Sequence, residues 1–339
     1  MTLALICGCS GLALTEGERA FIRAAQPWGL ILFKRNVADR DQLRSLTNAF
    51  RELVGRKDAP VLIDQEGGRV QRLAAPNWPA YPSAASFDVA IKDSAAALEA
   101  ARLCARLIAH DLLEVGITVN CAPVLDVAQP GAHAIIGSRS YSDDPIRVAA
   151  FGRAVAEAMM AGGVAPIIKH MPGHGRATVD SHLELPVVNA TLAELTRHDF
   201  AAFAALGDLP IAMTAHVVYS AVDRDRPATI SPIVVSRIMR DQIGFGGLIV
   251  SDDLSMKALG GSFAERARGV FNAGVDIALH CNGDQEEADA VAGECPELGG
   301  EALRRAQAAL ACIAHPPEEF DVEEGRAKLA LAFSAVTAT

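Results

Sequence analysis

Eight short apolar runs recur along this chain, and helix-compatible stretches separate most of them. The runs are Leu3–Cys7, Gly29–Phe33, Pro60–Ile63, Ile117–Asn120, Val164–Ile168, Pro210–Thr214, Gly247–Val250 and Val275–Leu279. The helical stretches include Asp41–Leu53, Ala95–Val115, Pro145–Ala161 and Leu192–Leu206, the last with a capping box at Thr191 and Glu194. Apolar runs followed by helices are typical of parallel strands that are buried on both faces. Eight such units predict an α/β fold, a single (β/α)8 TIM-type barrel, and a doubly wound open sheet is the competing topology.

Most of these runs end in or lead to polar residues. They are Asp64, Asp126, Lys169, His170, His216, Asp252, Asp253 and His280. In a barrel the carboxyl ends of all strands meet on one face, which is where the active sites of this architecture lie. The pattern therefore predicts a single polar site at that face.

Composition and charge fit one large soluble domain. The chain has 339 residues, of which 50% are hydrophobic and 21% are charged, and its formal net charge is -10. Without a basic patch, we expect neither a nucleic-acid partner nor adhesion to anionic membranes. We expect one domain over residues 1–339, with a peripheral tail from about residue 318, and a monomer.

The first apolar run does not fit a signal peptide, and the cysteines do not fit a disulfide framework, so we expect a reducing compartment. The first apolar run is too short for a signal peptide and lacks a basic leader, and no window is long enough for a membrane span. The seven cysteines are odd in number and lack zinc-finger spacing. A cytoplasmic location is therefore expected.

The segment after the fifth run concentrates titratable side chains, because Lys169 to His182 carries one Lys, three His and one Asp. Asp180 and His182 are two residues apart, so in an extended loop both side chains point to the same side. A carboxylate beside an imidazole fixes its tautomer, which makes this pair a candidate proton shuttle. After the seventh run, a strand-end carboxylate at Asp252 is a candidate nucleophile, with Asp253 as its partner or as a helix cap.

Several segments, in order along the chain, resemble the signature of glycoside hydrolase family 3. The similarity is greatest to its single-domain β-N-acetylglucosaminidase branch, the muropeptide-recycling enzymes. The matching segments are Ile63–Leu73, Ala122–Val127, Ile136–Tyr141, Lys169–Gly175, Asp180–His182 and Ser251–Met256. Several long motifs in the correct order are far more specific than any single short pattern.

The resemblance implies a retaining, two-step hydrolysis that needs no cofactor or metal. It assigns the nucleophile to Asp252 and the acid/base to His182, oriented by Asp180. It assigns sugar binding to Asp64, Arg72, Arg139, Lys169 and His170. The implied substrate is a small carbohydrate, a muropeptide or another GlcNAc glycoside that is cleaved from its end.

Three further residues near these motifs carry expectations of their own. His174 is expected to brace the catalytic loop, and His216 to line the site. Arg176 stands where relatives often carry a small or acidic residue, so it adds a positive charge beside the loop. The glycines of Gly173–Ser181 also predict that this loop moves to admit substrate.

Other functions stay open at this point. A metal-dependent barrel hydrolase would use His170, His174, His182, Asp64 and Asp252 as ligands. A phosphorylase would use the same site with phosphate in place of water. A catalytically silent sugar-binding protein is a third alternative, which the intact Asp180, His182 and Asp252 disfavour.

Overall fold

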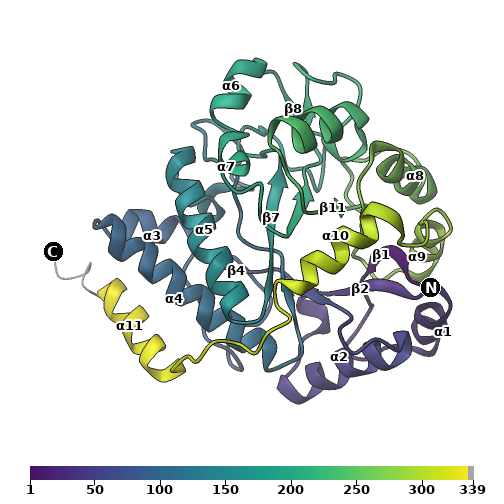
Figure 1. Ribbon diagram of the computed structural model, residues 1–339, viewed down its shortest axis with the longest axis horizontal. Helices are drawn as coiled ribbons and strands as arrows, with labels where there is room; N and C mark the ends of the chain where they lie inside the picture. Colours follow the sequence, from purple (N-terminus) through teal and green to yellow (C-terminus); the bar gives the residue numbers. More distant parts are fainter. Residues whose placement is uncertain (335–339) are drawn as a thin grey trace.

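A closed barrel of eight parallel strands forms the centre of the protein in the computed structural model, which describes residues 1–334 (Figure 1). The strands, in their order around the barrel, are β1 (Leu3–Cys7), β2 (Pro27–Leu32), β3 (Val61–Ile63), β6 (Val119–Asn120), β7 (Ala165–Met171), β9 (Ile211–Thr214), β11 (Leu248–Asp253) and β12 (Ile277–His280). The last strand pairs with the first, which closes the sheet. The predicted (β/α)8 barrel is thus confirmed, and the doubly wound alternative is wrong.

Each of the eight predicted runs overlaps one barrel strand, but β7, β11 and β12 continue past the ends of their runs into polar residues. Strand β7 continues to Met171, so Lys169 and His170 lie on the strand and not on the loop that follows it. Strand β11 continues to Asp253. Polar side chains can continue these strands because buried partners at the mouth of the barrel satisfy them.

Helices surround the barrel. Their bounds are α1 (Glu16–Ala25), α2 (Arg40–Val54), α3 (Ala84–Ala90), α4 (Ser94–Leu113), α5 (Pro145–Ala161), α6 (Leu192–Arg197), α7 (Ala201–Ala204), α8 (Phe263–Ala273), α9 (Gln285–Ala292), α10 (Gly300–Ala311) and α11 (Val322–Ser334). Short 3-10 turns lie at Lys34–Asn36, Gly137–Arg139 and Ala228–Ile230, and Val234–Gln242 is a π-helix. Two small pairs complete the chain: β4 (Gln65–Gly67) with β5 (Val70–Gln71), and β8 (Val187–Val188) with β10 (Val218–Tyr219).

Three of the four predicted helices agree with α2, α4 and α5. The fourth, over Leu192–Leu206, is broken into α6 and α7. Its capping box forms as expected, since the Glu194 N–H donates to Thr191 Oγ1 and Glu194 accepts from the Thr191 N–H. The interruption lies at His198–Phe200, where Asp199 is buried.

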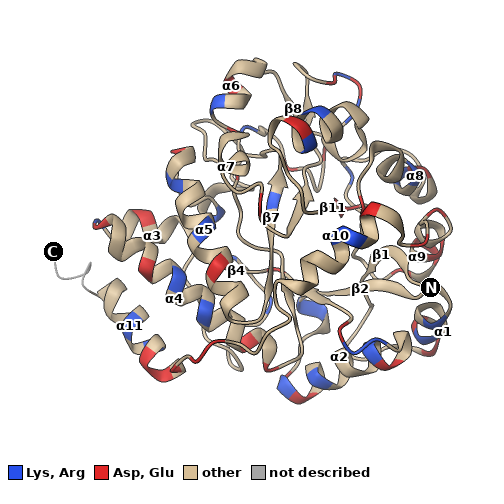
Figure 2. Cartoon of the chain, in the orientation of Figure 1, with Lys and Arg blue, Asp and Glu red and all other residues tan. Residues whose placement is uncertain are grey.

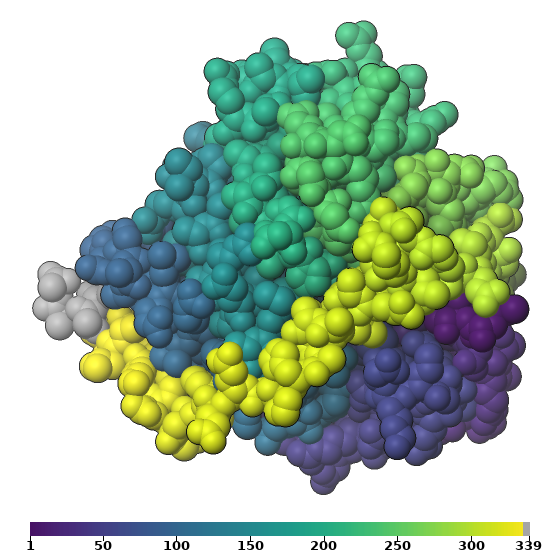
Figure 3. All heavy atoms as spheres, viewed as in Figure 1, coloured from purple at the N-terminus to yellow at the C-terminus, as the bar shows by residue number. Residues whose placement is uncertain are grey.

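Apolar side chains fill the inside of the barrel and its amino-terminal end. Ile31, Ile167 and Val250 belong to one inner cluster, which also includes Ala306 and Ala309 of α10. The chain leading into α10 hydrogen-bonds the start of β1, through Leu298 N to Thr2 O, so this helix covers the amino end. Figure 3 shows α10 and the segment after it crossing the face in view. The opposite end of the barrel is left for the site.

The C-terminal segment lies on the outside of the barrel. Helix α11 packs against α4, and the Glu318 N–H donates to Ala161 O. The end of the predicted tail, residues 335–339, lies outside the described residues. Acidic and basic side chains are interspersed over the outer helices (Figure 2). All seven cysteines are free thiols. Within residues 1–334, no helix combines the length and the apolar character needed to cross a membrane.

Candidate active site

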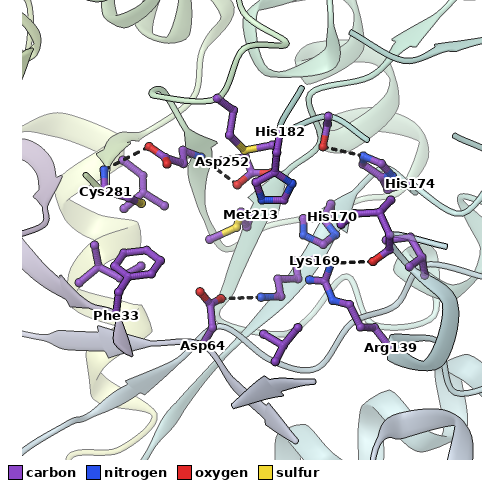
Figure 4. A pocket seen from close by; sticks show the side chains of 18 of the residues that line it. Phe33, Asp64, Arg139, Lys169, His170, His174, His182, Met213, Asp252 and Cys281 are labelled. Carbon is purple, nitrogen blue, oxygen red and sulfur yellow. Dashed lines mark hydrogen bonds and ion pairs between the residues drawn. The ribbon is translucent and has the colours of Figure 1, made fainter. Parts of the chain in front are cut away.

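A pocket of about 300 Å3 lies at the carboxyl ends of the barrel strands (Figure 4). Asp252 and His182, the candidate nucleophile and acid/base, both line it. So do all five residues that the resemblance assigns to sugar binding, which are Asp64, Arg72, Arg139, Lys169 and His170. The structure therefore brings together side chains that are far apart in the sequence. Asp180 does not line the pocket but contacts His182 from behind.

A buried network of opposite charges forms one wall of the pocket. Lys169 Nζ lies 2.7 Å from Asp64 Oδ1 and 2.8 Å from Glu66 Oε1. Arg139 binds both oxygens of Glu66 at 2.8 Å, and Arg72 Nη2 lies 3.0 Å from Asp64 Oδ2. Burial alone raises the pKa of Asp64, but the charges of Lys169 and Arg72 outweigh it and hold that pKa well below its usual value. Asp64 is therefore a carboxylate at neutral pH.

A second buried carboxylate, Asp126, orients two histidines. His170 Nδ1 lies 2.7 Å from Asp126 Oδ2, and the backbone N–H groups of His170 and His174 donate to Asp126 Oδ1. Burial raises the pKa of Asp126, but His170 and these donors lower it to about 2. Because the carboxylate only accepts, the His170 Nδ1 carries the proton and its Nε2 is left for other contacts.

His174 connects the two ends of the loop Gly173–Ser181, which leads to the candidate acid/base His182. Its Nε2 lies 3.1 Å from Ser181 Oγ, which agrees with the predicted bracing contact, and its ring also lines the pocket. Burial lowers the pKa of His174 to about 4, so the ring is neutral at pH 7. A neutral ring can stabilise the loop without adding charge near the sugar.

The candidate nucleophile, Asp252, lies at the end of β11. Its N–H donates to Thr214 Oγ1 at 3.1 Å, and its Oδ1 accepts the Asp253 N–H at 2.8 Å. Burial raises the pKa of Asp252, but the charges of His216 and His170 and the Asp253 N–H outweigh it and lower that pKa. Asp252 is therefore a carboxylate at neutral pH.

The neighbouring Asp253 contacts Asp252 through its backbone N–H, whereas its side chain makes contacts elsewhere. Its Oδ1 accepts the N–H groups of Ser255 and Cys281, so it connects the loop after β11 to the end of β12. Helix α8 begins only after its own cap at Ser262, so Asp253 is not that cap. The Asp253 side chain therefore braces the loop that follows the candidate nucleophile.

His216 lies behind Asp252 and Asp253 and does not line the pocket. The ring is fully buried, with Nδ1 2.7 Å from Thr229 Oγ1 and Nε2 3.0 Å from Asp253 O. Burial lowers its pKa. The expectation that His216 lines the site is therefore wrong, because both ring nitrogens are already engaged within the protein.

His182 and Asp180 form the predicted pair. His182 Nδ1 lies 2.7 Å from Asp180 Oδ1, which also accepts the His182 N–H at 2.9 Å. Burial raises the pKa of Asp180, but the hydrogen bonds from His182 together outweigh it and lower that pKa, so Asp180 is ionised. The His182 side chain is 58% exposed, and its Nε2 is the nitrogen left for a ligand. An imidazole held in one tautomer at the pocket can donate and accept a proton.

Sequence reasoning did not single out Glu66, and it named Asp126 among the strand-end residues without a partner. Glu66 and Asp126 both lie inside the matching segments, but nothing in the sequence shows which cations they pair with. Arg176 does not line the pocket and pairs with Asp199, so its charge is neutralised away from the sugar site.

The ligand set of the metal-dependent alternative does not assemble. His170 is paired with Asp126, His174 with Ser181, and Asp64 with Lys169 and Arg72. In residues 1–334 the metal-ligand side chains that converge as a group of three are His110, Asp111 and Glu114, on and just after α4. That group does not line the pocket.

Comparison with known proteins agrees with this geometry. Residues 8–307 match the family described as "Glycosyl hydrolase family 3 N terminal domain". A β-hexosaminidase from Methylococcus capsulatus is 41% identical over 276 residues, covering 80% of each chain. Native NagZ from Neisseria gonorrhoeae aligns with a TM-score of 0.81 and 33% identity, covering 99% of this chain and 96% of its own. The same NagZ in complex with N-trifluoroacetyl-D-glucosamine gives 0.83 and 32%, covering 99% and 97%. The chain therefore belongs to glycosyl hydrolase family 3, among its NagZ-like β-N-acetylhexosaminidases.

Proposed function

We propose that the protein is a retaining exo-β-N-acetylglucosaminidase that removes terminal, non-reducing β-linked GlcNAc. One observation carries this proposal. The pocket is lined by an ionised carboxylate, Asp252, and by the imidazole of His182, whose Nδ1 is bound to Asp180. A nucleophile and a proton donor in one pocket are the two groups that retaining hydrolysis needs.

In the first step, Asp252 attacks the anomeric carbon while His182 Nε2 protonates the glycosidic oxygen. The bond between that carbon and the oxygen breaks, and a glycosyl ester of Asp252 forms. Loss of this proton leaves the His182 imidazole neutral, and Asp180 retains its hydrogen bond to Nδ1. A positioned general acid of this kind contributes about 10²- to 10⁴-fold in rate.

In the second step, the neutral His182 removes a proton from water, and the resulting hydroxide equivalent attacks the same carbon. Asp252 leaves as a carboxylate, which its low pKa favours. Two inversions at one carbon give net retention of the β configuration. Asp180 stabilises the imidazolium that forms again at His182.

The charged wall of the pocket supplies sugar recognition. Arg72 lines the pocket, and Asp64 holds its guanidinium through Nη2, so Arg72 is positioned to donate to a sugar hydroxyl. His170 Nε2 is available on the other side, since Nδ1 is held by Asp126. Lys169, Asp64 and Arg139 supply further charged groups, whose hydrogen bonds are stronger than neutral ones. A volume of about 300 Å3 suits one terminal sugar.

The natural substrate in this proposal is a small cell-wall fragment, GlcNAc-1,6-anhydroMurNAc with or without a peptide. The family resemblance supports this choice, and a similar NagZ was solved with N-trifluoroacetyl-D-glucosamine, an analogue of the sugar. A cytoplasmic location is consistent with seven free thiols, six of which are buried. We expect the enzyme to act as a monomer, because the described site is complete within one chain.

The proposal is tested by release of 4-nitrophenol from its β-N-acetylglucosaminide, in phosphate-free buffer with a chelator. We expect turnover by the wild type and by the surface control Asp58→Ala, and none above background by Asp252→Ala. Activity that the chelator abolishes would favour the metal-dependent alternative. If added phosphate speeds turnover and GlcNAc 1-phosphate appears, the enzyme is a phosphorylase.

The role of His182 is tested with a series of leaving groups. We expect His182→Ala to lower kcat/KM about 10²- to 10⁴-fold for poor leaving groups and little for dinitrophenol, which leaves without a proton. An equal loss across the series would contradict His182 as the acid.

A further inference from the structure

The interruption between α6 and α7 places a carboxylate inside the protein, next to the catalytic loop. Asp199 is 1% exposed, and its Oδ2 lies 2.6 Å from Arg176 Nε. Burial raises the pKa of Asp199, and the Arg176 guanidinium opposes that rise. His198 Nδ1 is the other cation-forming group near Oδ2, at 3.8 Å. When a buried carboxylate has one close cation, removal of that cation leaves an uncompensated buried charge.

Arg176 lies in the first half of the catalytic loop, which packs closely against the barrel. A Cβ added at Gly175 would lie 1.9 Å from Val127 O, so the loop backbone touches the chain after β6 there. Ala177 O accepts the His133 N–H at 2.8 Å. Arg176 stands between these two contacts and adds the charged one.

The second half of the loop, which carries the acid/base, has fewer contacts outside itself. Asp180 binds His182 within the loop, and Ser181 contacts His174 at the start of the same loop. The contact from another segment is the Lys257 N–H to His182 O, at 3.4 Å. The position of the His182 ring therefore depends on how firmly the first half is held.

We propose that Arg176 is a positioning residue whose ion pair with Asp199 holds the catalytic loop so that His182 Nε2 reaches the glycosidic oxygen. This inference rests on the proposed function, in which His182 is the acid/base. The pair acts through the backbone, because Arg176 does not line the pocket. A displacement of about 1 Å at a reacting group can cost about 10²-fold in rate, so a modest loosening of the loop is measurable.

The geometry also predicts which substitution restores function. The contact uses Nε of Arg176 and not the paired terminal nitrogens. Lysine places a single charged nitrogen one bond beyond the position of Nε, and its flexible side chain can bring that nitrogen to the Asp199 carboxylate, so Arg176→Lys should retain the ion pair. Arg176→Ala removes it. Exposed Arg197, at the end of α6, is a matched control that lies close to the same site.

The experiment measures kcat/KM for aryl β-N-acetylglucosaminides, from 2,4-dinitrophenyl to phenyl, with wild type, Arg176→Ala, Arg176→Lys and Arg197→Ala. We expect Arg176→Ala to lose about 10-fold or more for the phenyl glycoside and less than about 2-fold for the dinitrophenyl glycoside. The loss in kcat/KM should be larger for leaving groups that need a proton from the enzyme in order to leave. Arg176→Lys should recover most of it, and Arg197→Ala should match wild type. An equal loss for every leaving group would overturn the proposal, because it indicates damage to the whole fold. So would no loss.

Amide hydrogen exchange over residues 174–183 provides a readout that does not need turnover. We expect faster exchange at these amides in Arg176→Ala than in wild type, Arg176→Lys or Arg197→Ala. Identical exchange in all four proteins would overturn the positioning role. If wild type hydrolyses none of the glycosides, the proposed function fails instead, and exchange alone then decides whether the ion pair holds the loop.

Discussion

Replacing Lys169 by Met tests whether the charged wall of the pocket is held together by one buried ammonium. The Lys169 side chain is 2% exposed and contacts Asp64 and Glu66 at 2.7 and 2.8 Å. Removing one partner of a buried ion pair typically costs about 3–5 kcal/mol, because an uncompensated charge remains. Each carboxylate here keeps one arginine, Arg72 or Arg139. We therefore expect the lower end of that range, about 3 kcal/mol of unfolding free energy at pH 7.

The same substitution has a pH signature with a defined sign. In the wild type, Asp64 and Glu66 have pKa values below their usual ones. They contribute stability that is present above the unfolded pKa of about 4 and is lost as pH falls through the folded pKa. Without Lys169, both folded pKa values rise, so the folded variant takes up protons at a higher pH than the wild type does. The stability gap between variant and wild type should therefore narrow as pH falls.

The assay is urea unfolding followed by circular dichroism at pH 7 and at pH 4.5, with Lys57→Met as the control on an exposed lysine. The control should remain within about 0.5 kcal/mol of wild type at both pH values. A gap for Lys169→Met below about 1 kcal/mol at pH 7 would refute the reasoning. So would a gap of the same size at both pH values, because the two carboxylates would then not be its source.

Three other predictions concern the site, two of them its activity and one the motion of its loop. Because the pKa of Asp252 is lowered, kcat/KM should hold its acid-side plateau down to about pH 4; an acid limb above pH 5 in a folded enzyme would contradict this. Gly175→Ala should lose about 10-fold or more in kcat/KM, since its Cβ would lie 1.9 Å from a backbone oxygen, whereas Gly246→Ala meets nothing within 4 Å and should match wild type. The loop Gly173–Ser181 should change its amide exchange when GlcNAc binds, chiefly beyond Ala177; identical exchange with and without the sugar would contradict its predicted motion.

The local sequence pattern was sufficient to predict the strands of the barrel. Strands β7 and β9 appear as apolar runs because both of their faces are buried, and a strand buried on both faces has consecutive apolar residues. Helix α5 begins and ends as predicted for the same reason, since its apolar face repeats along the chain. The contact between Asp180 and His182 could also be predicted from the sequence, because a spacing of two residues places both side chains together.

The partners of the charged residues could not be read from the sequence. Lys169 meets Asp64 across 105 positions, His170 meets Asp126 across 44, and Arg176 meets Asp199 across 23. Hydrophobic periodicity carries no information about such pairs, because they depend on which strand ends the closed barrel brings together.

The sequence by itself thus determined the barrel, its family resemblance and the face that carries the site. Only the tertiary structure decided that Glu66 joins the charged wall, that His216 lies behind Asp252, and that Arg176 turns to Asp199. The physical reason is that burial patterns are local, whereas a buried charge takes whichever partner the packed barrel places beside it.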